Sequence, residues 1–267
     1  MFDISGHRLR ASLDGQRVGT AEPRPPRRMR MIALSALGIS SRSAYPDGRK
    51  IISGLDLRAE PAMLTAVVGP SGAGKSTALD LVTGIQVPAA GSVLLGETRM
   101  HPATNRGRAR LRARVIASAR QTDDLIDALS VDENVLLAQR LARNPDRGFA
   151  EHMFLALDLD REVRRTPVRH LSGGQRRRVA IARACATGTP MLACDEPTTA
   201  LDESKAGLVR SLLRGAANSG RTVLVVTHDV ELATDADRLV QLVDGRTNAV
   251  LDRPSEQQVR HLMGAPR

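Results

Sequence analysis

The sequence has very few aromatic residues and very little lysine. It contains no Trp, one Tyr and three Phe in 267 residues, and 36 of its 39 basic residues are Arg. The formal net charge is nevertheless +10, and a basic surface attracts nucleic acid and anionic lipid. Because an Arg excess beside abundant Ala is also typical of coding bias, composition alone leaves both kinds of partner open.

Long apolar runs and cysteine pairs are missing as well. A run such as Val223–Val226 is far shorter than the ~20 residues that cross a bilayer, so we expect no membrane span. Residues 1–30 lack the apolar core of a secretory signal, and we therefore expect a cytoplasmic protein. Cys185 and Cys194 form no C-x-x-C pair, which predicts two buried, unreactive thiols.

The segment from Val67 to Thr77 fits the pattern G-x-x-x-x-G-K-[ST], between an apolar run and a predicted helix that stops at Gly84. In such a loop, backbone N–H groups and a helix N-terminus surround a phosphate. An accidental glycine-rich turn is the alternative, but a match in this strand-to-helix context favours the phosphate site. The candidate ligand-binding residues are Gly69, Ser71, Gly72, Ala73, Gly74, Lys75, Ser76 and Thr77.

A second hydroxyl and glycine segment, Leu171 to Gln175, opens a predicted helix. Ser172, Gly173 and Gly174 would suit an anion at the helix start, whereas a plain loop with a Ser cap is the alternative. The segment by itself leaves both interpretations open.

Two adjacent carboxylates, Asp195 and Glu196, follow the predicted buried strand Met191 to Cys194. Open α/β sheets bind ligands at this end of a strand, so Asp195 and Ser76 are candidate Mg²⁺ ligands and Glu196 a candidate base for water. A solvated pair is the alternative. His228 ends another predicted strand; a lone His is often structural, but here it is expected beside the Asp195 strand.

The order of predicted elements indicates a P-loop NTPase core of α/β class. We expect a mostly parallel sheet, an N-terminal antiparallel β-subdomain and an inserted α-helical subdomain at about residues 122–172. Residues 1–30 read as a disordered basic tail, residues 31–252 as the ATPase domain and residues 253–267 as a short C-terminal tail.

The ordered motifs resemble the nucleotide-binding subunit of ATP-binding cassette (ABC) transporters, most closely the compact lipoprotein-release and macrolide-export type. Gly69–Thr77 resembles the Walker A loop, Leu171–Gln175 the signature motif, and Met191–Glu196 the Walker B strand. The remaining matches are the Q-loop, the D-loop, the switch histidine and an adenine-stacking aromatic, at Gln121, Ala200–Asp202, His228 and Tyr45.

The resemblance implies an ATPase that dimerises head to tail around two ATP molecules, as a homodimer or with a second nucleotide-binding subunit. Ser172, Gly173, Gly174 and Gln175 of one copy would then contact the ATP held by Lys75 of the other. It further implies Glu196 as general base, His228 at the transferred phosphate, and Asp202 across the interface. Gln121, with Ser76 and Asp195, would serve Mg²⁺.

The resemblance also implies a place in the cell and partners. The subunit would be peripheral on the inner face of the cell membrane and drive transmembrane permease subunits, docking near Asp123, Asp124 and Leu125. A soluble ABC ATPase acting on ribosomes or nucleic acid is the alternative, and nucleic acid is the less expected partner. A cassette that binds ATP without cleaving it is a third option, against which Glu196 and His228 speak.

Two departures from the family pattern stand out. Ala119 and Arg120 precede Gln121 where an aromatic is usual, which leaves the packing beneath the Q-loop open. Pro61, Ala62 and Met63 replace a common Gly-Glu turn before the Walker A strand. Neither departure changes a predicted catalytic position.

Overall fold

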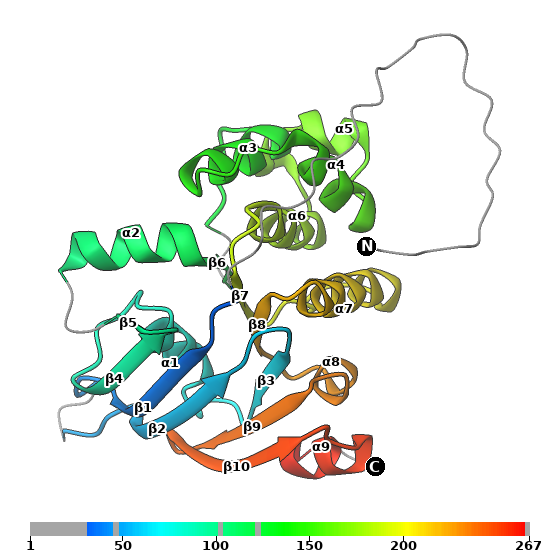
Figure 1. The fold of residues 1–267 in the computed structure, drawn as a ribbon. Helices are drawn as coiled ribbons and strands as arrows, with labels where there is room; N and C mark the ends of the chain where they lie inside the picture. Colours follow the sequence, from blue (N-terminus) through cyan, green and yellow to red (C-terminus); the bar gives the residue numbers. More distant parts are fainter. Residues whose placement is uncertain (1–30, 45–47, 101–103, 121–123, 265–267) are drawn as a thin grey trace, which may run out of the picture.

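The computed structural model describes residues 31–44, 48–100, 104–120 and 124–264, and these contain two β-sheets with helices around them (Figure 1). The larger sheet has six strands in the order β10-β9-β3-β8-β7-β6. The four strands β3, β8, β7 and β6 are parallel neighbours, and β9 is parallel to β3. In chain order the strands are β3 (Leu64–Val68), β6 (Ile116–Ala119), β7 (Met191–Asp195), β8 (Thr222–Val226), β9 (Arg238–Val243) and β10 (Arg246–Asp252).

Both faces of the larger sheet are covered, as expected for a parallel sheet. In β8, Val223 and Val225 join one apolar core with the helices α6 to α9, whereas Leu224 and Val226 join a second core. That second core also contains α1 and the antiparallel sheet. The predicted mostly parallel sheet is therefore confirmed.

The smaller sheet is antiparallel, with the order β2-β1-β4-β5. Its strands are β1 (Leu34–Ser40), β2 (Ser53–Ala59), β4 (Ala90–Leu95) and β5 (Thr98–Arg99). The two sheets are joined at their edges, since Ser53 N donates to Gly245 O at 3.0 Å and Thr247 Oγ1 to Asp56 O at 2.6 Å. This is the predicted N-terminal β-subdomain, and it lies beside α1 in Figure 1.

The predicted helical insertion is also present, and Figure 1 shows it gathered with α6 at one end of the molecule. It comprises α3 (Val131–Leu141), α4 (Arg147–Ala156), α5 (Arg161–Arg165) and a 3₁₀ turn (Val168–His170). The remaining helices are α1 (Lys75–Val82), α2 (Asn105–Val115), α6 (Gly173–Ala186), α7 (Glu203–Asn218), α8 (Val230–Thr234) and α9 (Glu256–Met263).

Three differences from the sequence-based expectation have local causes. The strand expected from Arg114 begins at Ile116, because Thr104 caps α2 and the helix continues to Val115. Within residues 253–267, expected as a short tail, the structure has α9, which begins at a capping box made by Ser255 and Gln258. Strand β10 was also not expected; it is an edge strand that alternates between exposed and half-buried residues.

Candidate functional site

The loop after β3 forms a phosphate cradle at the centre of the larger sheet. It connects β3 to α1, whose N-cap Gly74 has a left-handed backbone at φ 92°. The Lys75 ammonium group donates to the carbonyl oxygens of Gly69 and Pro70 at 2.9 and 3.0 Å. The lysine therefore spans the loop at the helix N-terminus, where helical N–H groups and the helix dipole favour an anion.

Two glycines of this loop are required by the backbone. Gly69 has φ +152°, and a Cβ there would lie 2.1 Å from the Leu242 carbonyl oxygen. At Gly74 a Cβ would lie 2.9 Å from the side chains of Ile51 and Ile52. The sequence prediction that these glycines shape the loop is thus explained by close approach of β9 and the antiparallel subdomain.

The carboxyl ends of β3, β8 and β7 bring the predicted site residues together. These strands are neighbours in the sheet, with Val67 opposite Val226, and Asp195 opposite the same Val226. His228 therefore follows a strand that lies between the phosphate loop and the Asp195 strand, as the sequence predicted. Glu196 N donates to Val226 O at 2.8 Å, which fixes the end of β7 against β8.

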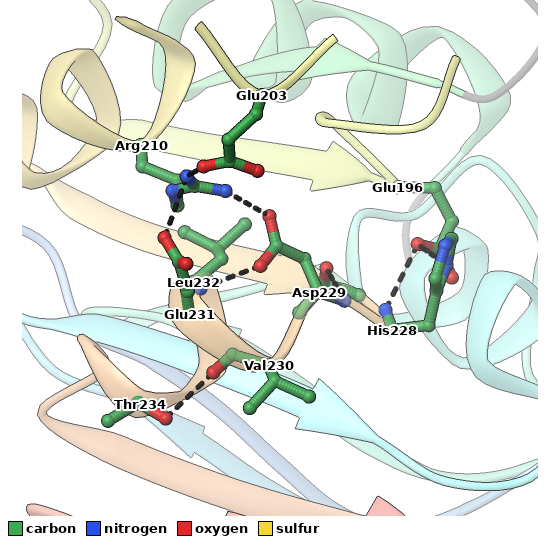
Figure 2. Close-up of polar contacts among 10 residues, drawn as sticks. Glu196, Glu203, Arg210, His228, Asp229, Val230, Glu231, Leu232 and Thr234 are labelled. Carbon is green, nitrogen blue, oxygen red and sulfur yellow. Dashed lines mark hydrogen bonds and ion pairs between the residues drawn. The ribbon is translucent and has the colours of Figure 1, made fainter. Parts of the chain in front are cut away.

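Glu196 and His228 form a hydrogen-bonded pair (Figure 2). The Nδ1 atom of His228 lies 2.6 Å from Glu196 Oε2, and the His228 backbone N–H donates to the same oxygen at 3.1 Å. Glu196 Oε1 takes no hydrogen bond from any described residue, and the His228 side chain is 66% exposed. Glu196 also has φ +50°, a backbone strain that costs about 1–3 kcal/mol and is typical of functional sites.

Asp195 is buried beside the phosphate loop and has an unsatisfied oxygen. Burial raises the pKa of the Asp195 carboxyl, and a hydrogen bond from Ser76 and the nearby Arg177 offset part of that shift. Its Oδ1 atom is buried without a hydrogen-bond partner among the described residues. A carboxylate and a hydroxyl are hard oxygen donors of the kind that Mg²⁺ prefers, so Asp195 and Ser76 fit the predicted metal site.

The signature segment lies at the start of α6, in the helical part of the molecule. Ser172 caps the helix, since its Oγ accepts from Gln175 N at 3.2 Å and Gln175 Oε1 accepts from Ser172 N at 2.9 Å. Ser172 and Gly173 are exposed, and an added Cβ at Gly173 meets no described atom within 4 Å. The segment is therefore an open helix N-terminus, and both earlier interpretations, Ser cap and exposed anion site, are compatible with it.

Asp202 begins the next helix, α7. Its Oδ1 accepts from Lys205 N at 3.0 Å and from Ser204 Oγ at 2.5 Å, and the preceding Ala200 has φ +63°. A left-handed residue followed by a capped helix gives this segment a fixed, exposed turn. Asp202 itself faces solvent and is separate from the Asp195 site along the chain.

Tyr45, Gln121 and Asp123 lie outside the described residues, so their predicted roles stay predictions. The segment before Gln121 is nonetheless held firmly. Arg120 pairs with Asp80 of α1 at 3.2 Å, and its carbonyl oxygen accepts from Arg177 at 2.6 Å. An ion pair to α1 thus takes the place where an aromatic is usual.

Sequence reasoning missed Arg177, which ties the signature helix to the Walker B strand. Its guanidinium donates to the carbonyl oxygens of Asp195 and Glu196 at 3.1 and 2.7 Å. The signal was present, because Arg177 shares a helix face with Ile181 and Ala184, which are both buried. An arginine inside an apolar stripe indicates a buried polar role.

Fold and site together define a P-loop nucleotide-binding protein. The class rests on the cradle after β3, the carboxylates after β7 and the histidine after β8 on adjacent parallel strands. The ABC transporter family model matches residues 52–199, and relatives more than 30% identical are covered over most of their length. The chain therefore belongs to the ABC transporter family.

Several known proteins are similar to this chain. The lipoprotein-releasing system ATP-binding protein LolD of Pseudomonas fluorescens is 35% identical over 77% of this chain and 92% of that protein. LolD of Anaeromyxobacter dehalogenans is 39% identical over 76% and 87%. The macrolide export ATP-binding/permease protein MacB of Campylobacter fetus is 32% identical over 80% of this chain but 33% of that longer protein.

The fold is likewise similar to solved ATP-binding cassettes. A dimeric, post-hydrolysis structure of the cassette MJ0796 bound to ADP and Pi has a TM-score of 0.78 and 27% identity. That match covers 83% of this chain and 99% of the other. The predicted P-loop NTPase fold and the predicted family are confirmed.

Proposed function

We propose that this chain hydrolyses ATP and powers an ABC transporter. The observation that carries the proposal is the Glu196–His228 pair, which faces the end of the sheet that also bears the phosphate loop. Family membership supports ATP as the nucleotide. A protein that only bound ATP would have no need of a strained carboxylate with one free oxygen beside an exposed imidazole.

Each residue of the site has a proposed part in the reaction. Lys75 and the loop N–H groups hold the β- and γ-phosphates, while Glu196 Oε1 takes a proton from the attacking water as Oε2 remains bound to His228. The exposed imidazole of His228 contacts the γ-phosphate. Catalysis then consists mainly of positioning and of electrostatic stabilisation of the transferred group.

The proposed metal is Mg²⁺, which when bound would neutralise phosphate charge and orient the terminal phosphoryl group. Ser76 and Asp195 would hold it, and Gln121 is the third proposed ligand. Arg177 keeps Asp195 in place by holding the backbone carbonyls at the end of β7. Neutralising the buried Asp195 carboxylate with a cation would also satisfy its unpartnered oxygen.

Two copies complete the proposed site. Ser172, Gly173, Gly174 and Gln175 of one copy would bind the γ-phosphate in the other copy's loop, with Asp202 contacting across the interface. The exposed helix start and the dimeric, nucleotide-bound MJ0796 structure support this arrangement. The partner is a second copy of this chain or another nucleotide-binding subunit.

The proposed membrane partner is a set of transmembrane permease subunits, with this chain peripheral on the inner face of the cell membrane. In the described part of the chain no helix is long and apolar enough to cross a bilayer. The relatives named for lipoprotein release and macrolide export support transport and do not favour a ribosome or nucleic-acid partner. We propose residues 31–252 as the ATPase domain.

The docking proposal has its own test. Asp124 and Leu125 precede α3, and Arg183 of α6 contacts the Asp124 carbonyl, so the entrance to the helical segment is fixed against the signature helix. Photo-crosslinkers placed at 124 and 125 should capture permease subunits in membranes. Crosslinks found only from the antiparallel sheet would contradict this face.

The function itself is tested with the purified chain, ATP and Mg²⁺. We expect phosphate release that a Lys75→Ala variant loses together with ATP affinity. A Glu196→Gln variant should keep ATP affinity but lose turnover by about 10²–10⁴-fold, the usual contribution of a general base. Turnover of Glu196→Gln at the unmutated rate would refute the assigned base, and no affinity for ATP would refute the function.

A further inference from the structure

Arg210 of α7 is an almost buried arginine surrounded by three carboxylates (Figure 2). Its side chain is 9% exposed. The guanidinium lies 2.9 Å from Asp229 Oδ2 and 2.7 Å from Glu231 Oε2, and it also contacts the Glu203 carboxylate. One side chain thus connects the start of α7 with the start of α8.

Both helix starts belong to the proposed site. Helix α7 begins at the D-loop residue Asp202, next to Glu203, and α8 begins at Asp229, directly after His228. Asp229 Oδ1 caps α8 by accepting from Leu232 N at 3.1 Å, while its Oδ2 binds Arg210. Asp229 N also donates to Thr227 Oγ1 at 3.0 Å, so the backbone on both sides of His228 is fixed.

This arrangement is costly for stability alone. Burying a guanidinium costs several kcal/mol unless its partners are well placed, and an apolar side chain of similar size often serves stability equally well. Arg210 lies among Ala206, Val209 and Leu213 on the buried face of α7, where an apolar residue would fit the pattern. A geometric role explains why an arginine is there.

We propose that Arg210 is a positioning residue that holds His228, through Asp229, at a fixed place relative to the D-loop. The proposal rests on the proposed function, in which His228 contacts the γ-phosphate and the D-loop meets the second copy. Because one guanidinium binds both helix starts, a movement of the D-loop on dimer closure is passed to the switch histidine. Dimer contact and phosphate contact would thereby be established together.

The chain offers a matched control on the same helix. Arg214, one turn further along α7, binds Asp237 Oδ2 at 2.8 Å and is 27% exposed. It is tied to the segment between α8 and β9 and does not contact Asp229. Arg210→Met and Arg214→Met therefore remove comparable ion pairs from α7, but only the first loosens the residue after His228.

The test compares Arg210→Met, Arg210→Lys and Arg214→Met in the full chain. We expect Arg210→Met to lower kcat at least tenfold while KM and the ATP dissociation constant stay within threefold. Arg210→Lys should recover most of kcat because it retains a charge for Asp229, and Arg214→Met should behave like the unmutated chain. Unchanged kcat in Arg210→Met, or an equal loss in Arg214→Met, would overturn the proposal.

A readout independent of turnover separates this proposal from the proposed function. The ring signals of His228 in a histidine-selective NMR spectrum, identified by their loss in His228→Gln, should shift in Arg210→Met and not in Arg214→Met. Signals that move in neither variant would overturn the positioning role even in an active enzyme. If the chain had no ATPase activity, the proposed function would fail while this shift would still decide how His228 is held.

Discussion

Replacing Gly173 by Asp should destroy the ATP-bound dimer while leaving the single copy intact. Gly173 is the first residue of α6, it is exposed, and an added Cβ meets no described atom within 4 Å. A carboxylate in the first turn of a helix is favourable by about 0.3–1 kcal/mol because of the helix dipole. We therefore expect unfolding by urea to show the variant to be at least as stable as the unmutated chain.

The cost arises only where a second copy brings its ATP to this helix. A carboxylate about 4 Å from one phosphate charge is repelled by about 4 kcal/mol at the effective dielectric constant of a protein surface. That energy weakens association about 10³-fold. Gly173→Ala is the neutral control: it adds a methyl group without charge, gains about 0.5–1 kcal/mol of helix stability and should weaken the dimer far less.

The assay measures ATP affinity of the single copy with a fluorescent nucleotide, and dimerisation by light scattering in a Glu196→Gln background. The reasoning predicts unchanged ATP affinity in Gly173→Asp and loss of the dimer at micromolar protein. A Gly173→Asp chain that dimerises as tightly as the control would refute the placement of the signature segment at the partner's nucleotide.

Three further predictions concern stability and thiol chemistry. Ala62 adopts φ +59°, so Ala62→Gly should raise the free energy of unfolding by about 1 kcal/mol in urea titrations, and a loss of stability would contradict this. Arg221 is 2% exposed and donates to the carbonyl oxygens of Thr189 and Cys185 at 2.8 and 3.0 Å, so Arg221→Met should lower the free energy of unfolding by about 2–4 kcal/mol, whereas a neutral result would show that those carbonyls find other partners. Burial raises the pKa of Cys185 to about 11 and of Cys194 to about 12, so neither thiol should react with a disulfide reagent at pH 8 until urea unfolds the chain; rapid labelling of the folded protein would contradict the predicted inertness.

Residue pattern predicted those parts of the molecule where one local signal determines the structure. The strands before Gly69, Asp195 and His228 are short apolar runs that end in polar residues, and all three are buried neighbours in the sheet. Ser172 and Gln175 form a capping box that is visible in sequence. The burial of both cysteines, predicted from their isolation, is confirmed.

Other parts depend on contacts that no local pattern reveals. Helix α2 contains five Arg and a Gly and has little apolar periodicity; it is held by Leu111 and Val115 and by Arg112, which donates to Gly84 O at 2.6 Å. Strand β10 forms through pairing with β9, although its Val250 is 51% exposed. Tertiary pairing thus outweighed weak local preference at both places.

The site was predictable in its residues but not in its supports. Sequence order indicates that Glu196 and His228 lie near each other, whereas their 2.6 Å contact depends on the pairing of β7 with β8. Arg177 and Arg210 occupy buried faces of their helices and could have been found as charges within apolar stripes. Their partners, distant in sequence, are fixed only by the fold.

The most direct test of the central claim is the mass of the Glu196→Gln chain in solution, measured by light scattering with ATP and Mg²⁺ and again with ADP. If ATP is shared between the phosphate loop of one copy and the signature segment of the other, the mass should double from 28.7 kDa with ATP and remain that of one copy with ADP. A chain that binds ATP tightly and stays a single copy at every concentration tested would contradict the shared site.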